Sequence, residues 1–183
     1  MTAILSNAAP LELWTDLVRD AENAVGAQLD EELESYLVFL LIAHTRDVHL
    51  HGNAVAFDYL LARAAGGARR KEELRQVGDR CLLLAGFYPE QAERRMVTVD
   101  YFLALGSHAY DELSVALRAG LAELFRRLAR AYARLARITL EVRRQMRDIA
   151  PLVLHELCTA QGDVARDPQF PGAVLLRGSG TPQ

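Results

Sequence analysis

Histidines and aspartates at helical spacing are the residues of this chain best suited to metal chemistry. His44, Asp47 and His51 lie three and four residues apart, so a continuous helix would place them in one angular sector. His108 and Asp111 repeat the three-residue spacing. Neutral imidazoles and carboxylates are ligands of Zn²⁺ and Fe²⁺. If the two helices are antiparallel neighbours, these five residues form a candidate metal site, with Asp47 or Asp111 as a ligand or general base.

The competing interpretation of these histidines is structural. The pattern HxxDxxxH is not a diagnostic metal motif, and hydrogen-bonded histidines at the edge of a core are much commoner than ligands. No Glu is followed three residues later by His, which argues against the standard di-iron site of helical bundles. The sequence therefore favours a protein without a cofactor and keeps zinc or iron as the alternative.

The familiar catalytic and nucleotide-binding motifs do not occur in this sequence. It contains no GxGxxG, no P-loop GK[ST], no HExxH, no CxxC and no GxSxG. Neither Cys81 nor Cys158 has an activating base beside it in sequence, and we expect Cys81 to pack as a small apolar residue. These observations favour a non-enzymatic role.

A second candidate site follows the glycine pair Gly66-Gly67, where Arg69, Arg70 and Lys71 begin a predicted helix. Free N–H groups and the positive dipole end at a helix start attract anions, so these three bases could hold a phosphate or carboxylate group. The spacing fits no known phosphate cradle. The commoner alternative is a solvated loop whose glycines end the preceding helix.

Charge is distributed unevenly along the chain, whose net charge is −3. Residues 1–60 carry a net charge of −8, whereas residues 118–147 hold nine arginines against two glutamates, a net charge of +7. In one interpretation these arginines form a solvated helix face, partly paired with the acidic first two helices. In the other they bind an acidic protein surface, which includes the acidic face of a second copy. The candidate contact residues are then Arg126, Arg130, Arg134 and Arg137.

Nucleic acid is a poorer partner for this basic segment. The acidic N-terminal region would repel phosphates, and few aromatic residues lie among the arginines. The sequence has no helix-turn-helix, zinc-finger or RNP signature. We therefore expect a protein partner or a homo-oligomer.

A periodicity of 3.6 residues recurs along the chain, and no long segment alternates with period two. Pro10 suits a helix start and Gly26 a helix end, Asp30 can cap the second helix, and Thr98 or Asp100 can cap the fifth. The predicted helices cover about 10–24, 31–51, 54–65, 69–86, 100–117 and 119–145, with short pieces at 90–96 and 152–158.

Length and composition predict one domain with a single core. The chain has 183 residues, of which 51% are apolar. We expect an all-α single-domain bundle of six or seven helices over residues 1–160 and an irregular or disordered tail over residues 161–183. Apolar runs are too short to span a bilayer and no secretory signal is evident, which predicts a soluble cytoplasmic protein without a membrane partner.

Asp79 and Arg80 interrupt an otherwise apolar helix. We expect either of them to be buried and paired across the bundle, with groups such as Arg46, Asp47 or Asp100. Such pairs more often fix the packing of helices than perform catalysis.

These features together predict a non-enzymatic helical interaction or regulatory module, in the form of a homodimer. It would act through its acidic N-terminal face and its arginine-rich long helix. The alternative is a helical metalloprotein or metal-dependent enzyme that uses the His/Asp cluster.

Overall fold

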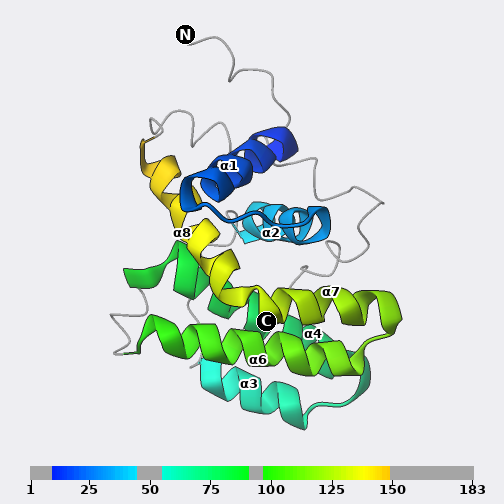
Figure 1. The fold of residues 1–183 in the computed structure, drawn as a ribbon. Helices are drawn as coiled ribbons and strands as arrows, with labels where there is room; N and C mark the ends of the chain where they lie inside the picture. The colour runs from blue at the N-terminus through cyan, green and yellow to red at the C-terminus, as the bar shows by residue number, and fades with distance from the viewer. Residues whose placement is uncertain (1–9, 45–54, 91–96, 149–183) are drawn as a thin grey trace, which may run out of the picture.

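The computed structural model describes residues 10–44, 55–90 and 97–148, and these ranges contain helices and no strand. Their arrangement is shown in Figure 1. The elements are α1 (Pro10–Val25), α2 (Glu31–His44), α3 (Val55–Ala64), α4 (Gly67–Leu82), the π-helix η1 (Leu83–Phe87), α6 (Val99–Ala116), α7 (Ala119–Arg130) and α8 (Tyr132–Asp148). The predicted all-α architecture is confirmed. The predicted tail, the helix at 152–158 and nearly all of the helix at 90–96 lie outside the described residues.

Several helix ends lie where local sequence signals predict them. Gly26 follows α1 with a φ of 63°, a conformation that glycine adopts without strain. The Oδ1 atom of Asp30 accepts a hydrogen bond from the Leu33 N–H at 3.1 Å and so caps α2. The Oγ1 atom of Thr98 accepts one from the Tyr101 N–H at 3.3 Å and caps α6.

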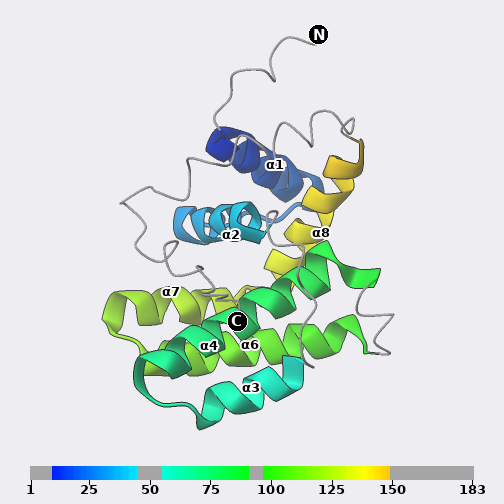
Figure 2. The ribbon, with the colours of Figure 1, turned by 180° about the vertical axis from the view of Figure 1, so that it is seen from behind.

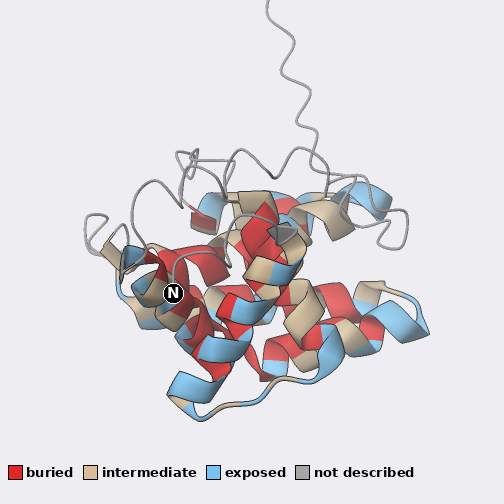
Figure 3. Cartoon of the chain, turned by 90° about the horizontal axis from the view of Figure 1, so that it is seen from above, coloured by how far each residue is buried: buried red, intermediate tan, exposed pale blue. Residues whose placement is uncertain are grey.

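The helices form two groups that α8 joins. Helices α4, α6 and α7 pack together, with α3 against α4 at one edge of the molecule, whereas α1 and α2 lie at the opposite end (Figures 1 and 2). Helix α8 packs against both α1 and η1. Buried residues gather on the inward faces of the helices, as Figure 3 shows. No described helix combines the length and the apolar character that a bilayer crossing requires.

The sequence prediction of one helix over 119–145 is wrong, because the segment forms two helices. Helix α7 ends at Arg130, α8 begins at Tyr132, and Ala131 between them has φ −88° and ψ 3°. Backbone hydrogen bonds continue on both sides, from the Ala131 N–H to the Arg127 carbonyl and from the Leu135 N–H to the Ala131 carbonyl, each at 2.9 Å. No Gly or Pro marks the bend. Its cause is packing, since α7 lies on α6 while α8 lies on α1 and η1.

The predicted helix over 69–86 also differs from a regular α-helix, because its last turn is the π-helix η1. The Tyr88 N–H closes this turn by donating to the Leu83 carbonyl, five residues earlier, at 2.8 Å. Gly86 in this turn faces α8. A β-carbon there would lie 2.6 Å from the Ala136 carbonyl oxygen and 2.7 Å from the Thr139 β-carbon, so a glycine allows η1 to approach α8 closely.

Candidate functional site

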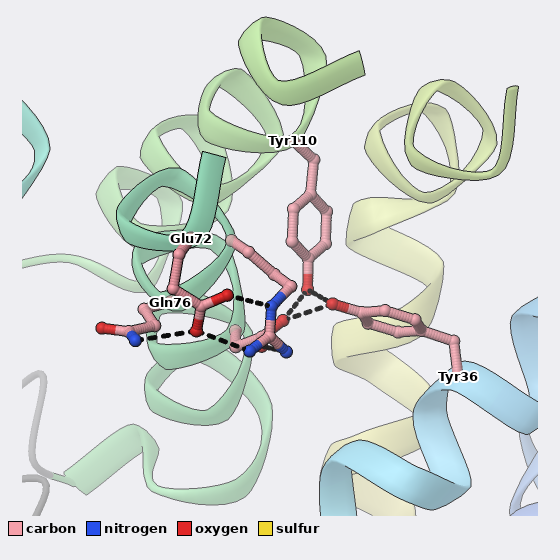
Figure 4. Close-up of polar contacts among 6 residues, drawn as sticks. Tyr36, Glu72, Gln76 and Tyr110 are labelled. Atoms are coloured by element: carbon pink, nitrogen blue, oxygen red, sulfur yellow. Dashed lines mark hydrogen bonds and ion pairs between the residues drawn. The ribbon is translucent and has the colours of Figure 1, made fainter. Parts of the chain in front are cut away.

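Asp79 is the centre of a buried polar cluster that joins three helices. This aspartate on α4 is only 2% exposed. Its Oδ1 atom accepts hydrogen bonds from the hydroxyls of Tyr36 on α2, at 2.6 Å, and Tyr110 on α6, at 2.5 Å. Figure 4 shows both tyrosine rings pointing toward the same group on α4. Its Oδ2 atom accepts from Arg75 Nη1 at 3.3 Å, so both carboxylate oxygens have partners.

The cluster extends along α4 toward the surface. Arg75 also donates to Glu72, from Nη2 to Oε1 at 2.8 Å and from Nε to Oε2 at 3.3 Å. The Gln76 side-chain amide donates to the same Glu72 Oε1 at 2.9 Å. A guanidinium group between two carboxylates compensates the buried negative charge of Asp79, which would otherwise be costly.

The predicted burial of Asp79 is confirmed, but Asp100 is not its partner. The distant partners are two tyrosines, Tyr36 and Tyr110, because a hydroxyl can reach a buried carboxylate without bringing a second charge. Arg80 is directed toward α3, where its Nη1 atom lies 2.5 Å from Asp58 Oδ2. Arg46 and Asp47, the other predicted partners, lie outside the described residues.

Two glycines make room for the tyrosines of this cluster. A β-carbon on Gly78 would overlap the Tyr110 ring, and one on Gly106 would overlap the Tyr132 hydroxyl. The Tyr132 hydroxyl donates to the Gly78 carbonyl at 2.6 Å, and the centroids of the Tyr110 and Tyr132 rings are 5.4 Å apart. The glycine next to Asp79 therefore takes part in the same packing as the aspartate itself.

Burial controls the protonation of these groups. It raises the pKa of Tyr36, Tyr110 and Tyr132 well above 10, and the negative charge of Asp79 raises each pKa further. Near pH 7 all three remain protonated hydrogen-bond donors and supply neither a nucleophile nor a general base. The cluster is thus suited to holding α2, α4 and α6 together rather than to moving a proton.

Cys81 is fully buried, and burial raises the pKa of its thiol to about 12. It is therefore a thiol at neutral pH and packs as the small apolar residue that the sequence predicts.

The structure brings the predicted metal ligands together only in part. His108 and Asp111 lie one turn apart on the exposed side of α6, and His44 is the last residue of α2. Asp47 and His51 lie outside the described residues. Within the described ranges no group of three or more His, Cys, Asp or Glu residues could hold a metal ion. The zinc or iron site remains a prediction that depends on Asp47 and His51.

Two of the three candidate anion-binding bases have carboxylate partners within the chain. Arg69 Nε lies 2.6 Å from Glu73 Oε1, and Arg70 Nη2 lies 3.3 Å from Glu112 Oε2. Lys71 is half-buried in the same turn. An external anion would compete with these carboxylates, and the anion site remains a prediction.

A pocket of about 240 Å³ lies between α3 and α4. Its lining residues are Asp58, Leu61, Glu73, Gln76, Val77 and Arg80. Because Asp58 and Arg80 bind each other within it, its charged groups are largely compensated.

The arginines of α7 and α8 divide into two sets. Arg127 forms ion pairs with Asp30 and, at 2.6 Å, with Glu32, which confirms pairing between this segment and the acidic start of α2. Arg126 pairs with Glu123 in its own helix. Arg134 and Arg137 donate to the backbone carbonyls of Gln28 and Val25, each at 3.3 Å. Neither forms an ion pair with a described carboxylate, although the charge of Arg134 acts on Glu22 and favours its ionised form.

Exposed arginines therefore remain at the end of α7 and along α8. We call them the arginine stripe; its members are Arg130, Arg134, Arg137 and Arg144. Among the described residues, the ion pair that this stripe forms joins Arg144 Nη1 to Glu141 Oε2 at 3.8 Å. Helix α1, which packs against α8, exposes Glu12, Asp16 and Asp20 at four-residue intervals. The molecule thus carries two helices of opposite charge side by side.

Comparison with known proteins adds no relative: no protein-family model matches the chain, and neither curated proteins nor solved structures give a significant match.

Two features of the structure are not predicted from the sequence. One is the pair of tyrosines on Asp79, for which the signal is an acidic residue just before the apolar residues that begin at Cys81. The other is an exposed apolar face on α3, signalled by apolar residues three and four positions apart.

Proposed function

We propose that this protein is a non-catalytic interaction module that binds an acidic protein surface through the arginine stripe. The proposal is carried by one observation, four exposed arginines of which three form no ion pair within the described residues. An exposed arginine presents a planar fork of donors that fits the two oxygens of a carboxylate. We further propose a cytoplasmic setting, in which the unpaired thiol of Cys81 is ordinary.

The acidic residues of α1 favour a protein partner over a nucleic acid. Glu12, Asp16 and Asp20 lie on α1, which packs against α8, the helix that carries three of the four stripe arginines. A long phosphate backbone crossing the stripe would approach these carboxylates and be repelled. A folded protein can present carboxylates to α8 alone, and a partner with basic residues at the edge of its acidic patch would also match α1.

Binding of a fluorescein-labelled polyglutamate peptide, measured by anisotropy, tests this proposal. The double variant Arg130→Glu with Arg144→Glu removes the two stripe residues that do not also bond to the end of α1 or to the connection that follows it. We expect a dissociation constant on the order of 10 µM at low salt for the native chain and binding roughly tenfold weaker for the variant.

A second double variant, Arg63→Glu with Arg118→Glu, changes the net charge equally at exposed positions outside both the stripe and the candidate anion site. We expect this control to bind within about twofold of the native chain. Equal losses in the two variants, or no binding of the peptide by the native chain, would contradict the proposal. Tighter binding to a duplex DNA of equal charge would instead assign the stripe to nucleic acid.

A further inference from the structure

Helix α3 presents a contiguous apolar face to the outside of the molecule. Phe57, Leu60 and Leu61 are 52%, 60% and 47% exposed, and Ala64 continues their helical spacing. The residues that α3 buries are Val55 and Ala62, on its other side. Figures 1 and 2 both show α3 at the edge of the molecule, with α4 and α6 on one side of it. We call these four residues the α3 face.

The α3 face differs from the other exposed apolar residues of the described chain. The other exposed large apolar residues come from three helices: Tyr101 and Val115 from α6, Leu121 from α7 and Leu140 from α8. Single exposed apolar side chains are normal on protein surfaces, whereas adjacent ones bordered by polar residues are typical of interaction surfaces.

The charges that border the α3 face are balanced in pairs. Asp58 binds Arg80, Arg63 Nε lies 3.1 Å from Glu112 Oε1, and Arg69 pairs with Glu73. In a symmetric dimer the same patch meets itself, so a patch of one charge sign repels its own copy. Two copies of the arginine stripe would repel each other because the stripe is positively charged. Two copies of the α3 face would not, because the charges around it are balanced. The charge balance therefore favours a second copy as the occupant of the α3 face.

The order of side chains on the α3 face also suits self-association. In a two-fold symmetric antiparallel pair, residue i of one copy lies opposite residue j of the other, and the reverse holds as well. With the axis between Leu60 and Leu61, Phe57 lies opposite Ala64 of the second copy, so that a large side chain meets a small one at both ends. The four leucines fill the centre. Such alternation of large and small groups lets facing helices interdigitate.

We infer that the α3 face is a homodimer interface in which two α3 helices pack antiparallel about an axis between Leu60 and Leu61. The helix has ten residues, and an interface based on it is at the small end of specific protein contacts. We therefore expect a reversible dimer with a dissociation constant on the order of 10 µM. This surface is separate from the arginine stripe, so the inference does not depend on the proposed function.

Sedimentation equilibrium of the full chain over a range of concentrations measures the dimer. Leu60→Asp places two carboxylates next to the symmetry axis, and we expect it to weaken association at least tenfold. Val115→Asp makes the same change at an 82% exposed position on α6 and is expected to leave association within about twofold of the native chain. A native chain that stays monomeric, or a dimer that Leu60→Asp does not weaken, would overturn the inference.

Oxidative cross-linking tests the register, in chains that also carry Cys158→Ser. Copper-phenanthroline as oxidant should link Leu60→Cys chains to one another. It should link Phe57→Cys chains to Ala64→Cys chains in a mixture, but neither of these variants to itself. Cross-linking of Phe57→Cys chains to one another would indicate a parallel pair and overturn the antiparallel arrangement.

Discussion

Helix α4 lies between two regions that differ in the side chains they bury and expose. On one side, Asp79 carries charge into the interior, and tyrosine hydroxyls and a guanidinium group satisfy both of its carboxylate oxygens. On the other side lies α3, whose large apolar residues face outward. The first region uses polar groups where an apolar core is usual, and the second uses apolar groups where a polar surface is usual. The difference suggests that the first region fixes the arrangement of this chain and that the second serves contact with another chain.

Alkaline pH should have the largest effect on the Asp79 region. The pKa values of Tyr36, Tyr110 and Tyr132 are raised in the folded chain above the unfolded value of about 10. Their contribution to stability is therefore complete below about pH 10 and is lost as the pH rises further, by about 1.4 kcal/mol per pH unit for each tyrosine. We expect cooperative unfolding above pH 10. Circular dichroism measures the loss of helix, and tyrosinate absorbance measures the ionisation of the tyrosines. Three tyrosines that ionise near pH 10 while the helices persist would contradict this.

Removal of the central carboxylate should have the next largest effect. Asp79→Ala leaves Arg75 without its buried partner and two hydroxyls without an acceptor, and it should lower the free energy of unfolding by about 3–5 kcal/mol in a urea titration. Asp58→Ala, which breaks the more exposed ion pair with Arg80, is the matched control and should cost about 1 kcal/mol. Equal losses in the two variants would mean that burial gives Asp79 no special importance.

Adding one methyl group should distinguish tight from open packing. Gly106→Ala places a β-carbon against the Tyr132 hydroxyl and 2.7 Å from the Cys81 β-carbon, and should cost about 1–3 kcal/mol of unfolding free energy. Gly120→Ala in α7 meets nothing within 4 Å and should stabilise by about 0.4–1 kcal/mol. Thermal melts of the two variants should shift in opposite directions, and a shift in the same direction would argue against the close packing at Gly106.

The smallest effect on folding is expected at the α3 face. Leu60→Asp should change the free energy of unfolding by no more than about 0.5 kcal/mol in dilute protein, because the side chain is largely exposed. A urea titration at low concentration measures this quantity without a contribution from association. A loss of several kcal/mol would show that Leu60 belongs to the core of its own chain.

The parts of the fold that the sequence predicts depend on local signals. Pro10, Gly26, Asp30 and Thr98 each act through bonds within a few residues, and the helix ends that they predict are observed. The bend at Ala131 has no such signal, because alanine continues a helix as readily as any residue. It follows from the different surfaces on which α7 and α8 pack.

The candidate sites also lack local sequence signals, because contacts between distant residues determine them. The polar character of Asp79 is visible in the sequence, but its partners are 43 residues before it and 31 residues after it, and no local periodicity connects them. The exposure of the α3 face depends on which side of a ten-residue helix meets α4, which its own spacing does not decide. The sequence shows the charge asymmetry, but it does not show the carbonyl contacts that hold Arg134 and Arg137 near α1.

The position of Asp79 near the middle of the chain has a consequence during synthesis. Tyr36 precedes it, while Tyr110 and the neighbouring Tyr132 are translated later. An emerging chain that ends before Tyr110 lacks one of the two hydroxyls for this carboxylate, and contacts of such long sequence separation form slowly. Neither the N-terminal nor the C-terminal half contains a complete interior. Most of the helical region must therefore emerge from the ribosome before the chain can complete its core.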